Sequence, residues 1–157
     1  MTDMTIKTTE ASDVAFIRMH GPYSQIPEAI KTLYIWVGIH MMQPMDMPTA
    51  VYYTVPENGD DSNAQWEIFT PIKGEHPSRE PDKKGCGIRR REAQLVASTI
   101  HVGSYETVGT TYEALAEWMT EQGYRMSGPP EESYLSDPKD TPPEEFLTEV
   151  RLPVQKA

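Results

Sequence analysis

Apolar residues recur at helical spacing in two stretches of the chain. The first stretch follows Ser24, whose side chain can cap the start of a helix, and the second covers about residues 107–122. The apolar faces comprise Ile26, Ile30, Leu33 and Val37 in the first stretch, and Val108, Tyr112, Leu115 and Met119 in the second. This pattern predicts two amphipathic helices, each with one face buried in a core.

Each predicted helix lies between stretches whose composition favours β-strands. These stretches are rich in β-branched and aromatic residues and are bounded by Gly, Pro, Asn and Asp. They cover residues 5–19, 50–55 and 65–72 in the first half of the chain, and 88–102, 133–136 and 146–154 in the second. Each half is therefore predicted to fold as strand, helix, strand, strand, which makes the chain an α+β protein.

The two halves also share individual residues at one constant spacing. Trp36 recurs as Trp118, and Tyr23 recurs as Tyr105, each 82 residues further along the chain. The correspondence needs no gap and extends to Gly, Pro, Leu and Glu positions. Because chance rarely aligns Trp, Tyr, Gly and Pro in one register, we interpret it as the duplication of one module.

The first copy of the module covers about residues 4–73 and the second about residues 88–155. Residues 74–87 are charged, rich in Pro and Gly, and are predicted to link the two copies. Since each copy is small for an independent fold, we expect one pseudo-symmetric domain over residues 1–157. Its antiparallel sheet is expected to carry a central ligand groove at the seam of the modules, where pockets often form.

Period-two alternation predicts which strand residues face away from the helices. In the closing strand of each half, apolar residues take the helix side, which leaves Glu67, Phe69 and Glu149 on the opposite face. In the middle strands, we expect Tyr52 and Tyr134 to share that opposite face with the glutamates. The predicted groove would then combine carboxylates with aromatic rings.

This combination of residue types points to a particular kind of ligand. A partly buried carboxylate attracts a cation, and aromatic faces suit flat, apolar cations. The alternatives are that the two glutamates form salt bridges, and that the tryptophans only pack in the helix cores. The candidate ligand-binding residues are Glu149, Glu67, Tyr134, Tyr52, Tyr105, Tyr23, Trp118, Trp36 and Phe69.

Composition excludes several other functions. Acidic residues outnumber basic ones 24 to 14, and the formal charge of −10 argues against direct nucleic-acid binding. Arg89, Arg90 and Arg91 form the one dense basic run, which reads as a solvated strand start. The single Cys86 and the polar first residues indicate a cytoplasmic protein, and no apolar stretch approaches the ~20 residues of a membrane span. The four histidines lack metal-ligand spacing, so we expect no metal and no cofactor.

Several segments carry a family resemblance. They are HGPYSQI at 20–26, HVGSYETV at 101–108, YEALAEWMTEQGY at 112–124 and ESYLSDPKDTPPEEFLTEVRLPV at 132–154. Over about residues 4–155, the chain resembles the GyrI-like small-molecule-binding family, which supplies effector domains to AraC-type and multidrug-sensing regulators. The resemblance implies two strand–helix–strand–strand modules around a central groove. In drug-sensing members an acidic groove residue recognises lipophilic cations, and the resemblance implies that Glu149 corresponds to it, with Tyr134 in the preceding strand of the family pattern.

Three functional hypotheses follow. The chain lacks a helix-turn-helix segment, so the first is a stand-alone binding protein for hydrophobic, cationic small molecules, with Glu149 as the counter-ion. The second is a hydrolase of electrophilic small molecules, in which Glu149 or Glu67 activates water as a general base. The third is a protein-interaction module, such as a gyrase inhibitor, whose acidic surface meets a basic partner. The sequence leaves the oligomeric state open.

Overall fold

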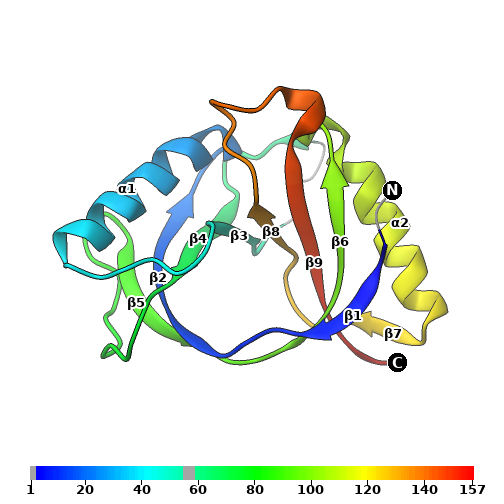
Figure 1. Ribbon diagram of the computed structural model, residues 1–157, viewed down its shortest axis with the longest axis horizontal. Helices are drawn as coiled ribbons and strands as arrows, with labels where there is room; N and C mark the ends of the chain where they lie inside the picture. Colours follow the sequence, from blue (N-terminus) through cyan, green and yellow to red (C-terminus); the bar gives the residue numbers. More distant parts are fainter. Residues whose placement is uncertain (1–2, 55–58) are drawn as a thin grey trace. The chain divides into compact units, whose positions relative to one another are not determined.

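The computed structural model describes residues 3–54 and 59–157. The chain divides into two compact units, coloured along the sequence in Figure 1. The C-terminal unit consists of Met1–Thr9 with Gln94–Ala157, and the N-terminal unit consists of Glu10–Ala93. Val55, at the end of one predicted strand, lies outside the described residues.

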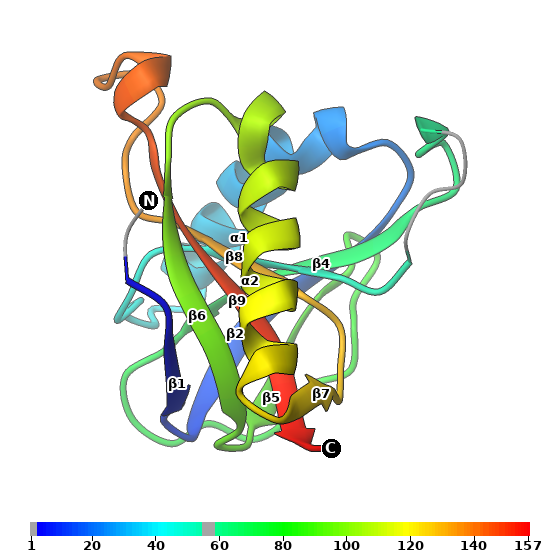
Figure 2. The same cartoon turned by 90° about the vertical axis from the view of Figure 1, so that its right-hand side faces the viewer.

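The C-terminal unit is a four-stranded antiparallel sheet that carries one long helix. Its sheet order is β1-β6-β9-β8, and β7 pairs with the C-terminal end of β9. Helix α2 lies along β6 and β9, as Figure 2 shows. The elements are β1 (Thr5–Thr8), β6 (Leu95–Val102), the 3-10 turn η3 (Tyr105–Thr107), α2 (Val108–Glu121), β7 (Tyr124–Met126), β8 (Glu131–Tyr134), the 3-10 turn η4 (Pro143–Glu145) and β9 (Leu147–Lys156).

The N-terminal unit repeats this plan. Its four antiparallel strands run in the order β3-β4-β2-β5, and helix α1 packs on β2 and β4. The elements are β2 (Ser12–His20), the 3-10 turn η1 (Tyr23–Gln25), α1 (Ile26–Ile39), β3 (Thr49–Tyr52), β4 (Gln65–Pro71) and β5 (Cys86–Arg91). Both helices have 14 residues, and they begin at Ile26 and Val108, which are one repeat apart. The predicted α+β class and the duplicated strand–helix–strand–strand plan are confirmed.

The first strand of each repeat, however, pairs inside the other unit. The stretch predicted as one strand region over 5–19 contains two strands, β1 and β2. Strand β1 pairs with β6, whereas its repeat equivalent β5 pairs with β2. The residues predicted to form a linker accordingly belong to the N-terminal unit, and its last two positions, Cys86 and Gly87, already lie in β5.

The helices bury the faces that their apolar spacing predicted. In the C-terminal unit, Leu115 and Met119 of α2 pack against Val150, Leu152 and Val154 of β9. Burying side chains of this size stabilises a fold by roughly 1.5–3 kcal/mol each. In the part of the chain that the structure describes, no helix is long and apolar enough to cross a bilayer.

The middle strands face the opposite way from the sequence prediction. Tyr52 lies opposite Trp66, and Tyr134 lies opposite Thr148, so both tyrosines point to the helix side of their sheets. The prediction that they share a face with the glutamates is therefore wrong. Strand β3 is buried on both faces over Thr49–Val51, so its hydrophobicity carries no information about which residue faces which side. Only the hydrogen-bond register with β4 sets that choice.

Candidate functional site

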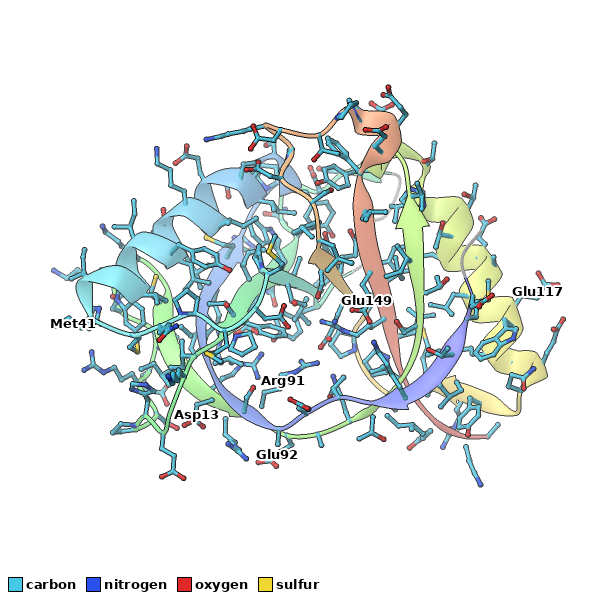
Figure 3. The ribbon with its side chains drawn as sticks, in the orientation of Figure 1. Asp13, Met41, Arg91, Glu92, Glu117 and Glu149 are labelled. Carbon is cyan, nitrogen blue, oxygen red and sulfur yellow. The ribbon has the colours of Figure 1, made fainter. Side chains whose placement is uncertain are left out.

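Glu149 lies on β9, and its side chain lies on the face opposite α2 (Figure 3). Its Oε2 is 2.7 Å from the Lys7 Nζ and accepts a hydrogen bond of 2.7 Å from the Ser98 Oγ. Its Oε1 accepts from the Arg151 Nη1 at 3.1 Å. The carboxylate is thus largely buried and already sits between two cations.

These contacts control the protonation of Glu149. Burial raises its pKa and is the largest single effect, because the charged form loses hydration. The hydrogen bonds from Lys7 and Ser98 and the charge of Arg151 together outweigh burial, and the pKa lies below its ordinary value. Glu149 is therefore a stable anion at neutral pH. A general base for hydrolysis is better served by a pKa raised toward 7.

The network extends to a second acidic residue on β8. Arg151 donates from Nε to the Glu131 Oε1 at 3.1 Å, and Gln94 donates to the Glu131 Oε2 at 3.1 Å. Glu131 and Glu149 are thus joined through Arg151, with Lys7 as the second cation. Both carboxylates are thus paired with basic side chains.

Glu67 occupies the equivalent position in the N-terminal unit and is more deeply buried. Its side chain is 0% exposed, whereas that of Glu149 is 13% exposed. Arg89 donates to both of its oxygens, at 3.2 and 2.9 Å, and the Tyr53 hydroxyl donates to Oε2 at 2.6 Å. Burial, followed by the Glu67 charge, raises the pKa of Tyr53 far above its ordinary value. Both glutamates therefore form salt bridges, which was the alternative to ligand binding considered for them.

Two tyrosine pairs recur in the two units. Tyr23 contacts Tyr52 edge-on, with ring centroids 5.3 Å apart, and Tyr105 contacts Tyr134 edge-on at 5.7 Å. Tyr105 also stacks on Phe146 at 5.0 Å. Each pair joins the turn before a helix to the helix side of a middle strand. Both pairs lie on the face away from Glu67 and Glu149.

Glu132 is the carboxylate that accompanies the tyrosines. It lies opposite Val150 in the sheet register, and therefore on the helix side together with Tyr134. The Tyr112 hydroxyl of α2 donates to the Glu132 Oε2 at 2.5 Å. Burial and then the charge of Glu132 raise the pKa of Tyr105. A buried carboxylate thus lies among three tyrosines.

Sequence reasoning did not include Glu132 among the candidate residues. A signal was available, since Glu132 and Tyr134 are two positions apart in one strand and must share a face. The duplication instead singles out Glu67 and Glu149, because they are the glutamates that occupy equivalent strand positions in the two repeats. The equivalent of Glu132 in the first repeat is Ala50, so the duplication gives no indication of this site.

The remaining candidate aromatic residues serve in packing. Trp36 is buried, donates from Nε1 to the Asp82 carboxylate at 3.0 Å and packs on the His40 ring. Trp118 is partly buried and packs against the hydrophobic core between α2 and β9. Phe69 is buried beside Glu67, with the Arg91 guanidinium 4.7 Å above its ring. Whether any of them also contacts a ligand stays a prediction.

Within the described ranges, 3–54 and 59–157, no group of three or more His, Cys, Asp or Glu residues is arranged to hold a metal ion.

The candidate glutamates and tyrosines lie on two different faces of the sheet in each unit. One face carries the charge-paired glutamates, and the helix side carries the tyrosine pairs. In the C-terminal unit the helix side adds a buried carboxylate, Glu132, whose repeat equivalent in the N-terminal unit is Ala50.

The chain belongs to the GyrI-like family, because the profile of the GyrI-like small molecule binding domain matches residues 2–155. It is a small-molecule-binding domain of this class. No curated protein matches the sequence. The family resemblance predicted from the sequence motifs is confirmed.

Solved structures share the fold at low sequence identity. EcmrR in its cryo-EM complex with DNA is 19% identical with a TM-score of 0.83, over 99% of this chain and 58% of the EcmrR chain. The chain thus spans little more than half the length of EcmrR. A hydrolase from Listeria innocua is 16% identical with a TM-score of 0.78, over 98% of this chain and 92% of that one. SAV2435 bound to tetraphenylphosphonium is 14% identical with a TM-score of 0.58, over 98% and 94%.

Proposed function

We propose that this protein binds hydrophobic, cationic small molecules, with Glu132 as the counter-ion and Tyr105 and Tyr134 as aromatic contacts. The observation that carries the proposal is a buried carboxylate surrounded by tyrosines on the helix side of the C-terminal unit. A cation beside a buried carboxylate is attracted more strongly than in water, and each ring face adds about 0.5–2 kcal/mol. The structure of SAV2435 with tetraphenylphosphonium supports a lipophilic cation as the first probe.

Glu149 is the other carboxylate to test as the counter-ion. A ligand cation at Glu149 would have to compete with Lys7 and Arg151, which already hold both of its oxygens. Displacing a cation from a largely buried carboxylate costs the contacts that cation makes. We place Glu132 first because it shares the helix side of the sheet with Tyr134 and lies close enough to Tyr105 to raise the pKa of that tyrosine. The roles predicted for Glu149, Glu67, Tyr23 and Tyr52 in ligand binding remain predictions.

The test is a calorimetric titration with tetraphenylphosphonium and with triphenylphosphine oxide, a neutral compound of similar shape. We expect Glu132→Gln to weaken binding of the cation about tenfold or more, equivalent to at least about 1.4 kcal/mol, and to leave the neutral compound nearly unchanged. Glu149→Gln serves as the matched carboxylate variant, and Glu117→Gln, on the exposed face of α2, as the surface control.

Each outcome of this titration has a definite meaning. Loss of cation binding in Glu149→Gln alone would return the counter-ion role to the residue predicted from the sequence. Equal binding of the cation and the neutral compound would remove charge recognition from the proposal. Absence of binding by the unmodified protein to either compound would contradict the proposal altogether.

The hydrolase alternative receives no support from the protonation of Glu149, because its pKa is lowered. The protein-interaction alternative likewise stays a prediction.

A further inference from the structure

A buried histidine joins strand β6 to the two segments that follow it. Figure 2 shows the chain passing from β6 through a turn into α2, which lies over that strand. His101 of β6 is buried and lies opposite Thr148 in the sheet register, on the helix side. Its Nε2 is 2.9 Å from the carbonyl oxygen of Ser104, and its Nδ1 is 2.6 Å from the Thr111 Oγ1. The ring therefore bridges the turn before α2 and the first turn of α2 itself.

These two contacts assign the donor and the acceptor of the ring. A carbonyl oxygen only accepts, so the nitrogen that faces Ser104, Nε2, carries the proton and donates. In the neutral imidazole the other nitrogen is an acceptor, and the Thr111 hydroxyl donates to it. The Ser104 carbonyl also accepts from the amide and the hydroxyl of Thr107, at 3.1 and 2.9 Å. His101 thus takes part in fixing the backbone of this turn.

The hydrogen bond to Ser104 fixes the residue before one tyrosine of the proposed ligand site. Tyr105 follows Ser104 in the chain, and its ring contacts that of Tyr134 edge-on, with centroids 5.7 Å apart. Burial and then the charge of Glu132 raise the pKa of Tyr105, so the phenol lies near this carboxylate. Holding the Ser104 carbonyl therefore holds the Tyr105 ring beside Glu132 and Tyr134.

The hydrogen bond from Thr111 fixes the residue before a second tyrosine. Tyr112 follows Thr111 on α2, and its hydroxyl donates to the Glu132 Oε2 at 2.5 Å. The Thr111 side chain is buried, so its bond to His101 is shielded from competing water. One imidazole therefore ties down both segments that bring a tyrosine to Glu132.

The first repeat provides an internal comparison for this network. The residues equivalent to His101 and Thr111 are Met19 and Ala29, and the carboxylate position of the site corresponds to Ala50. Methionine fills a core without needing a hydrogen-bond partner, and alanine is a better helix former than threonine. The N-terminal unit reaches the same strand–helix–strand–strand plan with these residues. The fold itself therefore does not require the histidine, which occurs in the unit that also has the buried carboxylate.

We propose that His101 is a positioning residue of the ligand site, which holds Tyr105 and Tyr112 at Glu132 through its two hydrogen bonds. This inference rests on the proposed function. The two tyrosines come from different segments, and a segment that is ordered only when the ligand binds lowers the affinity. Fixing both segments in the free protein removes that cost. His101 then acts on the ligand through the tyrosines, without touching it.

The first test is made by NMR on the full chain without ligand. We expect the proton of the His101 ring on Nε2, seen in its ¹⁵N–¹H correlations, and a nuclear Overhauser effect between the rings of Tyr105 and Tyr134. The variant His101→Met with Thr111→Ala copies the residues of the first repeat and should lose that ring contact. A proton on Nδ1, or a ring contact that persists in the folded double variant, would overturn the proposal.

The second test is calorimetric titration with tetraphenylphosphonium. The double variant should bind the cation about tenfold more weakly, and Thr111→Val, which keeps the branched shape and removes the donor, about fivefold. His101→Gln offers one acceptor and one donor at the end of its side chain and should stay within about twofold of the unmodified protein. His20→Met, the matched change at an exposed position of β2, should leave the dissociation constant unaltered.

The titration separates this inference from the proposed function. Unchanged binding by the folded double variant overturns the role of His101 and leaves the ligand site intact. An equal loss in His101→Gln also overturns it, because the shape of the ring and not its hydrogen bonds would then set the affinity. If the double variant does not fold, Thr111→Val and His101→Gln decide by the same criteria. Absence of binding by the unmodified protein contradicts the proposed function and any effect of His101 on affinity, whereas the ligand-free spectra still decide whether His101 holds the tyrosines.

Discussion

At the scale of single residues, one carboxylate position has two different settings in the two repeats. Glu67 is paired with Arg89, the repeat equivalent of Lys7, and also accepts from the Tyr53 hydroxyl, with Phe16 and Phe69 nearby. Around Glu149 the equivalents of those phenylalanines are Ser98 and Arg151, which both donate to its carboxylate. The two repeats therefore share the ion pair, but two phenylalanines near Glu67 correspond to a serine and an arginine that donate to Glu149.

The protonation of Glu149 gives a stability prediction. Its folded-state pKa lies below the ordinary value of 4.5, so its contribution is present above that value and is lost as the pH falls through the folded pKa. At neutral pH we expect Glu149→Gln to be less stable than the unmodified protein by about 1–3 kcal/mol. Urea unfolding over a pH series should show this difference shrinking on acidification. A pH-independent difference would mean that packing, and not charge, accounts for the loss.

At the scale of elements, the two helices end in the same backbone conformation with different residues. Gly123 meets the left-handed requirement without cost, and Met41 does not. Because Met41 is exposed, its replacement removes little packing in the monomer. The end of α1 is therefore expected to be less stable with Met41 than it would be with a glycine, the residue that ends α2.

We expect Met41→Gly to raise the free energy of unfolding of the monomer by up to about 1 kcal/mol, since relief of the left-handed strain exceeds the entropy cost of glycine. The reciprocal change Gly123→Met should lower it by a similar amount. Thermal unfolding at a concentration where the protein is monomeric measures both. Destabilisation by Met41→Gly would show that the methionine side chain makes contacts that stabilise the monomer.

At the scale of the whole molecule, the compact units do not coincide with the sequence repeats. Strand β1 completes the edge of the C-terminal unit, where Lys7 also reaches Glu149. Strand β5 completes the N-terminal unit by pairing with β2. Each repeat thus supplies its first strand to the unit formed by the rest of the other repeat, and neither repeat contains a whole unit.

Removal of residues 1–8 should therefore affect distant parts of the sequence. We expect amide exchange to accelerate in β6, around residues 95–98, because those residues lose their β1 partners. Exchange in β2, which pairs with β4 and β5, should change far less. Hydrogen exchange with mass spectrometry distinguishes the two strands. Faster exchange confined to β2 would mean that β1 belongs to its own repeat.

The sequence alone determined the helices, the α+β class, the duplication and the family, because each is encoded locally in apolar spacing and repeated residues. It also determined which face of β9 carries Glu149, since the apolar residues of that strand alternate clearly. It could not orient β3 and β8, which are short and buried on both faces, so hydrogen-bond register alone places Tyr52, Glu132 and Tyr134. The exchange of first strands likewise depends on which distant strand offers a pairing edge. Only tertiary structure makes that choice, because it is a property of contacts between residues far apart in the chain.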